Sequence, residues 1–169
     1  MAAVLKDCDI PAHVESNTGY FSSYEIQVIL SMLRILDNPL QDIPMAAVLA
    51  SPIVGMDDEE LAQIRSAFKG VSFAQAALSA MAGENGYEDE KLKAFALVFE
   101  RLRGAVADTP IHELLYRMLD ETGFYRYASA MPAGKRRRQN IDMLIEMAAA
   151  YEKTSYKGLF HYIRYIDIH

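Results

Sequence analysis

Four consecutive basic residues, Lys135 to Arg138, stand out in a chain of 169 residues whose formal net charge is −6. They fall at the expected start of a helix, where positive charge opposes the helix dipole and calls for a compensating group. A nearby carboxylate, an acidic partner surface or a phosphate at the helix end would each compensate it. The residue types leave a solvent-exposed or intramolecular role and a nucleic-acid contact both open, and the acidic background confines any DNA contact to a local site.

The sequence carries no complete motif for nucleotide binding or nucleophilic catalysis. Gly134-Lys135 would match the end of the phosphate-binding loop G-x-x-x-x-G-K-[ST], but Ser129 replaces the first glycine and Arg136 the final serine or threonine. The G-x-S-x-G motif of serine hydrolases is absent as well. We therefore expect no cofactor and no catalysis in this chain by itself.

Metal-binding patterns are also incomplete. His112-Glu113 begins like the zinc motif H-E-x-x-H, but Tyr116 takes the place of the second histidine, so we expect a structural or surface role for His112. Four carboxylates at 57–60 would point around a helix rather than converge on an ion, and they fit a helix start. With Cys8 as the single cysteine, the sequence predicts no metal site.

Composition predicts one compact domain in a reducing cytoplasm. The chain is 51% hydrophobic and 24% charged, which is ordinary for a globule that buries its own core. A lone cysteine cannot form an internal disulfide. No apolar run reaches the roughly 18 residues of a membrane span, and Met1 is not followed by a signal segment. We expect a cytoplasmic protein without a membrane partner.

Helix signals follow one another along most of the chain and predict an all-α, bundle-like fold. Ser22 to Glu25 has the S-x-x-E form of a capping box, and Thr109 is a candidate N-cap before Pro110. Residues 12–15 look extended but are too few for a sheet. The expected helices cover about 22–37, 43–49, 57–68, 72–81, 88–107, 110–122, 124–130, 134–151 and 156–166.

Three prolines, Pro39, Pro44 and Pro52, interrupt the chain within twenty residues. Each proline ends a helix or begins one, because its ring fixes φ and removes an N–H donor. The breaks let consecutive short helices turn back on one another. We expect this crooked segment to be a scaffold that gives the helix from Ser22 and the helix at Asp57 one shared core.

Several motifs together resemble one family of DNA helicases. The spacing Arg137-x-x-Asn140-Ile141-x-x-Leu144 is similar to a signature of the helical 2B subdomain in UvrD-like superfamily 1 helicases. Other segments are similar to the AddA branch, one of the two subunits of the AddAB (RexAB) helicase-nucleases, although Ala50 stands where that branch often has arginine. These segments are ESNTGYF at 15–21, DNPLQDIP at 37–44, AAVL at 46–49, SPIVG at 51–55, AMPAGK at 130–135 and TSYKGLF at 154–160.

The resemblance implies that the chain is an inserted subdomain. Residues 1–14 would be the tail of motor domain 2A, with Asp9 in place of the family's usual glycine, and 15–169 the 2B-like helical subdomain. The ends near Ala12 and Ile168 should then lie close together, because an inserted domain enters and leaves its host at one place. The motifs for ATP and Mg, and the cysteines of an iron–sulfur cluster, would lie in the parent protein outside this chain.

The implied function is an accessory role in the AddA component of an ATP-dependent DNA helicase/exonuclease of double-strand break repair and recombination. The fragment would guide DNA or contact the AddB subunit without catalysis. Lys135, Arg136 and Arg138 are the candidate DNA contacts. We expect Arg137 and Asn140, three residues apart on one helix face, to be structural: Arg137 pairing with a carboxylate and Asn140 bonding a nearby backbone group.

A second interpretation is a free-standing α-helical adaptor whose basic cluster binds an acidic partner protein. No period of about 30 to 45 residues recurs along the chain, which counts against a helical solenoid. The two interpretations differ in whether the chain continues into helicase motifs.

Overall fold

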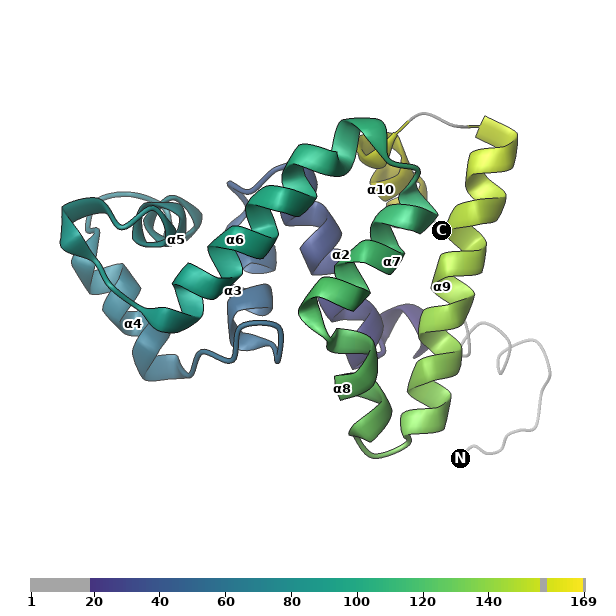
Figure 1. Ribbon diagram of the computed structural model, residues 1–169, viewed down its shortest axis with the longest axis horizontal. Coiled ribbons are helices and arrows are strands. Elements are labelled where there is room, and N and C mark those ends of the chain that lie inside the picture. The colour runs from purple at the N-terminus through teal and green to yellow at the C-terminus, as the bar shows by residue number, and fades with distance from the viewer. Residues whose placement is uncertain (1–18, 156–157, 169) are drawn as a thin grey trace.

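The computed structural model describes residues 19–155 and 158–168 (Figure 1). This part of the chain is helical and contains no strand, which confirms the all-α prediction. Predicted features at Cys8, 1–14 and 12–15 lie outside the described residues. The helices are α2 (Tyr24–Asp37), α3 (Asp42–Ala50), α4 (Asp58–Ala67), α5 (Phe73–Met81), α6 (Glu90–Ala105), α7 (Ile111–Thr122), α8 (Phe124–Ala130), α9 (Gly134–Ser155) and α10 (Leu159–Ile168), with 3-10 turns at Glu84–Gly86 and Val106–Asp108.

The helices form two lobes (Figure 1). They are joined where α2 packs on α3 and where α6 crosses from one lobe to the other. We call α3, α4 and α5 the small lobe, and α7, α8, α9 and α10 with α2 the large lobe. Helix α6 crosses between them, packing on α5 at one end and α7 at the other. Helix α2 packs against α3, α6, α9 and α10 and is the common centre of the fold.

The central position of α2 explains its composition. Apolar residues recur in this helix at spacings of three and four, as in Ile26, Ile29 and Leu33, but Val28, Met32 and Ile35 are buried as well. A helix enclosed by neighbours on several sides must be apolar nearly all round. The sequence pattern therefore identified the helix but understated how much of it is core.

The crooked segment has the scaffold role expected of it. Asn38 leaves the helical region before buried Pro39, and the Gln41 side-chain amide donates to the carbonyls of Arg34 and Asn38 at 2.9 and 2.8 Å. The Arg34 carbonyl also accepts the Asn38 backbone N–H, so the Gln41 side chain reinforces the end of α2 and holds the following turn against it. Ile64 of α4 belongs to the same buried cluster as the α2 side chains, so the two helices share one core as predicted.

Two predicted helix caps are wrong. The hydroxyl groups of Ser22 and Ser23 donate to the Gly19 carbonyl, and the Glu25 side chain is buried instead of closing a capping box. Thr109 is not the N-cap of α7, because Pro110 occupies that position. At the start of α2 no side chain caps the helix by a hydrogen bond.

Helix α10, the last described helix, packs against α2. Arg34 of α2 forms an ion pair with Asp167 of α10 at 2.7 Å. Ala12 lies outside the described residues, so the predicted closeness of Ala12 and Ile168 stays a prediction. None of the described helices combines the length and the hydrophobicity that a membrane crossing requires.

Candidate nucleic-acid interface

The basic run begins at a tight turn between α8 and α9. Ala133 has a positive φ of 61°, and the next residue, Gly134, starts α9. A Cβ atom added to Gly134 would lie 1.9 Å from the Ser129 carbonyl oxygen, so only glycine fits there. This close approach places the first turn of α9 directly against the end of α8.

Arg137 turns away from the other basic residues and binds a buried carboxylate. Glu25 of α2 is 1% exposed, and its Oε1 lies 2.7 Å from Nη1 of Arg137. The Asn140 side-chain amide donates to the other oxygen, Oε2, at 2.8 Å. Arg137 Nε also donates to the Pro132 carbonyl at 2.8 Å. We call Glu25, Arg137 and Asn140 the carboxylate cluster.

The carboxylate cluster partly corrects the sequence prediction. Arg137 has the carboxylate partner that was expected, but Asn140 bonds that same carboxylate and not a backbone group. The backbone carbonyl of Asn140 in turn accepts a hydrogen bond from the Tyr20 hydroxyl at 2.9 Å. A buried ion needs every lone pair satisfied, and two donors at Glu25 serve that need. The effect of either residue on stability stays a prediction.

The other basic residues of the run lie on the outside. Lys135 and Arg136 are accessible to solvent, and in the described part of the chain neither forms an ion pair. Arg138 is half-buried near Tyr125. Burial, followed by the charge of Asp142, raises the pKa of Tyr125, while Arg138 lowers it. Three cations thus remain available at one end of α9, beside its free N–H groups.

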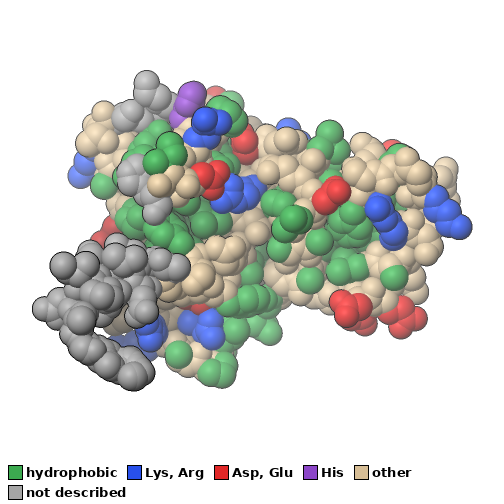
Figure 2. Space-filling view, turned by 180° about the vertical axis from the view of Figure 1, so that it is seen from behind, with side chains coloured by type: hydrophobic (Ala, Val, Ile, Leu, Met, Phe, Trp, Pro, Cys, Tyr) green, Lys and Arg blue, Asp and Glu red, His purple; other side chains and the backbone are tan. Residues whose placement is uncertain are grey.

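The positive charge is local, as the sequence predicted. Residues 124–138 contain five Lys or Arg residues and no Asp or Glu, in a chain of net charge −6. Figure 2 shows the opposite face of the molecule, where acidic and basic side chains lie in small separate groups and no continuous basic surface forms among the described residues. The segment 124–138 thus carries positive charge with no carboxylate next to it in the sequence.

His112 holds a structural position and not half of a zinc pair. Its Nδ1 lies 2.6 Å from Glu152 Oε1, and the Glu152 carboxylate accepts the backbone N–H groups of Ile111 and His112. Glu152 of α9 thereby caps α7, the role that sequence spacing gave to Thr109. Among the described residues, no group of His, Cys, Asp and Glu side chains gathers in a way that could hold a metal ion.

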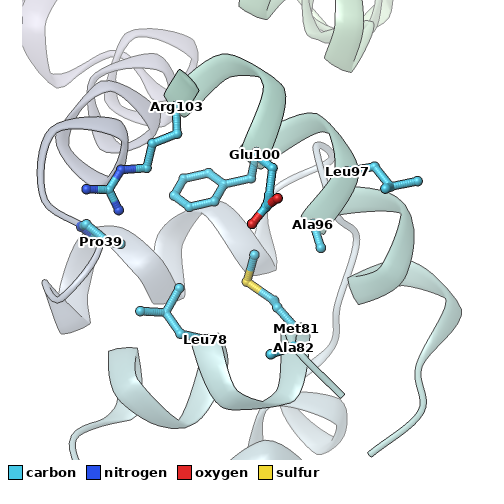
Figure 3. Close-up of a pocket in the computed structure, with 9 residues that line it drawn as sticks. Pro39, Leu78, Met81, Ala82, Ala96, Leu97, Glu100 and Arg103 are labelled. Carbon is cyan, nitrogen blue, oxygen red and sulfur yellow. The ribbon is translucent and has the colours of Figure 1, made fainter. Parts of the chain in front are cut away.

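An apolar pocket of about 530 Å³ lies between α5 and α6 (Figure 3). Leu78 and Met81 of α5 line it together with Phe99 of α6, while Leu97 points away from them. Glu100 and Arg103 stand on the α6 side. Sequence reasoning missed this pocket, because it placed the α5 and α6 residues on separate helices without showing that the two helices leave a gap.

Comparison with known proteins places the chain in a defined class. Curated relatives are the A subunits of ATP-dependent helicase/nucleases: 42% identity over 161 residues in Anoxybacillus flavithermus, 41% over 167 in Bacillus cytotoxicus and 38% over 167 in Bacillus mycoides. The matches cover 94–96% of this chain but only 13–14% of those proteins. No protein-family model matches. The chain is homologous to one segment of these helicase/nuclease A subunits, which confirms the resemblance to AddA.

Proposed function

We propose that this chain is the 2B-type accessory subdomain of the AddA component of an ATP-dependent DNA helicase/exonuclease that acts in double-strand break repair and recombination. The observation that carries the proposal is the identity of 38–42% to such proteins over nearly the whole chain. Residues 1–14 would end the motor domain and 15–169 would form the subdomain. The enzyme would act in the cytoplasm.

In this proposal the segment binds DNA and leaves catalysis to the rest of the enzyme. Lys135, Arg136 and Arg138 contact DNA phosphates, since none of the three forms an ion pair within the described part of the chain. The segment holds no ATP, Mg or iron–sulfur cluster, all of which belong to other parts of the longer protein. The AddB subunit is the protein partner. The exposed charges support local phosphate contact and the carboxylate cluster supports a scaffold that presents them.

The alternative is an α-helical adaptor that binds another protein. The pocket of Figure 3 favours it, because Leu78, Met81 and Phe99 offer an apolar recess with Glu100 and Arg103 beside it. The coding context distinguishes the two. A reading frame that continues past His169 into a sequence like TIHKSKGLEF supports the helicase proposal, and a stop codon at that point supports the adaptor.

The proposal is tested by changing Lys135, Arg136 and Arg138 to alanine in the full-length helicase-nuclease. There the motor domains hold DNA nearby and raise its effective concentration at the segment. We expect weaker binding of forked or duplex DNA, with the log–log salt slope flattened by about 0.9 for each phosphate that the variant no longer neutralises. Circular dichroism should be unchanged.

The matched control replaces three cations elsewhere on the surface, Lys69, Lys153 and Arg164, by alanine. It removes the same charge but should leave the salt slope close to that of the parent. Equal affinity and slope in the Lys135, Arg136 and Arg138 variant and the parent would refute the DNA contact.

A further inference from the structure

We infer that a pocket formed by α7, α8 and α9 binds a base of single-stranded DNA, with a preference for guanine. The inference rests on the proposed function and specifies its ligand: the basic residues would hold the phosphates while the pocket takes a base. The pocket has a volume of about 560 Å³ and lies at the α8–α9 hairpin that carries the basic run.

The walls of the pocket combine aromatic and apolar surface. Tyr116 of α7 is 59% exposed, an unusual position for a large ring, and Tyr125 of α8 lines the same pocket. Leu119 and Ile145 are buried residues that close the bottom. Aromatic side chains of this kind are the stacking platforms on which single-stranded nucleic acids place their bases.

Carboxylates at the rim supply the preference for guanine. Asp120 follows Tyr116 by four residues and so lies next to it on the same face of α7. It is exposed and forms no ion pair within residues 19–155 and 158–168. A carboxylate accepts hydrogen bonds, and guanine presents adjacent N1–H and N2–H donors, whereas thymine presents a single N3–H between two carbonyl groups. Asp142 is less available, because the Tyr125 hydroxyl donates to it at 3.2 Å.

Cations on the same hairpin provide for the phosphates on either side of the base. Arg126 lies in the pocket wall and is exposed, and Arg138 acts electrostatically on Tyr125. Lys135 and Arg136 continue the positive charge around the start of α9. Arg126 directly follows Tyr125 in the pocket lining, so a cation stands next to a ring, and the basic run follows on the same hairpin. That pattern suits a strand whose bases and phosphates alternate.

A duplex and a protein partner fit this pocket less well. Bases paired in a duplex do not expose their faces, so a pocket with a stacking wall selects an unpaired base. The recess of Figure 3 contains one aromatic ring, Phe99, which is 4% exposed, whereas the hairpin pocket presents Tyr116 at 59% exposure. The hairpin is therefore the better nucleic-acid site of the two.

The test is a titration of the 169-residue chain, at low salt, with the pentanucleotides d(TTGTT) and d(TTTTT), followed by amide chemical shifts. We expect d(TTGTT) to bind more tightly and to shift amides of residues 116–126. Tyr116→Ala should weaken binding about tenfold, within the range that stacking supports. Tyr116→Phe keeps the ring and should bind like the parent. Asp120→Asn should remove the preference for guanine.

Tyr127→Ala is the matched control, since Tyr127 is 52% exposed on the same helix as Tyr125 but does not line the pocket. It should bind like the parent. Equal affinity of Tyr116→Ala and the parent overturns the pocket, as does a response of the pocket amides to hexa-arginine peptide but not to either oligonucleotide. Those results do not affect the proposed duplex contact if the Lys135, Arg136 and Arg138 variant of the full-length enzyme still binds duplex DNA more weakly than the parent. If the oligonucleotides bind in the pocket but the Lys135, Arg136 and Arg138 variant keeps the salt slope of the parent, only the phosphate contact is refuted.

Discussion

The two lobes are stabilised by different kinds of polar contact. In the small lobe, side chains cap their own helices: Asp57 and Glu60 form a reciprocal capping box, and the Ser72 hydroxyl accepts the Gln75 N–H. The distant contact there, from the Ala74 N–H to Asp42, spans 32 positions. In the large lobe, Glu25 binds residues 112 and 115 positions away. Local contacts make a helix begin at the right residue. Distant contacts decide which helices lie together, and their removal should cost more.

The largest effect is expected for Glu25→Ala in the large lobe. The change removes the buried carboxylate and leaves the Arg137 side chain, which is 23% exposed, with the Pro132 carbonyl and without its ionic partner. Breaking a buried pair in this way costs about 3–5 kcal/mol of unfolding free energy. Urea unfolding measures it, and Glu59→Ala, at an exposed position on α4, should change stability little. A decrease at Glu25 no larger than the control's would show that the cluster does not hold the lobe together.

Asn140→Ala should have the next largest effect. It removes the amide that donates to Glu25 Oε2 and leaves that oxygen buried with one fewer partner. The expected decrease is roughly 1–3 kcal/mol. Gln139→Ala, at the exposed neighbouring position, is the control. An unchanged melting temperature for Asn140→Ala would contradict a structural role for this residue.

Asp57→Ala tests the small lobe. The Asp57 carboxylate accepts the Glu60 N–H at 2.8 Å at the start of α4. Removal of such a cap costs about 1 kcal/mol. Thermal unfolding should therefore show a smaller decrease than for Glu25→Ala. A larger decrease would reverse the proposed difference between the lobes.

Acid should weaken the same corner of the small lobe. Hydrogen bonds from the Asp57 N–H and from Lys91 lower the pKa of Glu60 below its ordinary value of 4.5. A lowered folded-state pKa means that this contribution is present above pH 4.5 and is lost as the pH falls through the folded value. The melting temperature of Glu60→Gln should depend less on pH below 4.5 than that of the parent. Identical pH profiles would rule out this contribution.

The smallest effect is expected for Tyr162→Phe in α10. The Tyr162 hydroxyl is buried, and within the described residues it has no hydrogen-bond partner. Burial also raises the pKa of Tyr162, so the hydroxyl stays neutral. Removing an unpaired buried hydroxyl should leave stability unchanged or slightly higher. A clear decrease of stability in calorimetry would show that the hydroxyl does have a partner.

The sequence predicted local elements well and distant contacts poorly. Asp57 to Glu60 was predicted correctly as a helix start, and the helix expected at 110–122 ends at Thr122, before the left-handed Gly123. The sequence pattern at Ser22 to Glu25 fits a helix cap as well as the one at Asp57 to Glu60, yet the Glu25 side chain is buried and binds Arg137 of α9. No spacing rule shows which of two similar acidic residues will face a distant arginine.

The candidate site shows the same limit. The family resemblance singled out Arg137 and Asn140, since both lie in one short motif, but not their partner on α2. The pocket residues Tyr116 and Asp120 were passed over because their importance lies in their exposure beside α8 and α9. Exposure depends on the packing of three helices, which a single helical pattern does not contain.

Helix α9 also has a mechanical consequence. It is attached near its start through Arg137 to α2 and near its end through Glu152 to α7. These anchor points are about fifteen residues apart, or about 22 Å along a helix that rises 1.5 Å per residue. A pull on Lys135 or Arg136 is therefore carried as tension along a stiff rod to the start of α7. A force applied at the start of α9 would in this way reach the start of α7 through Glu152.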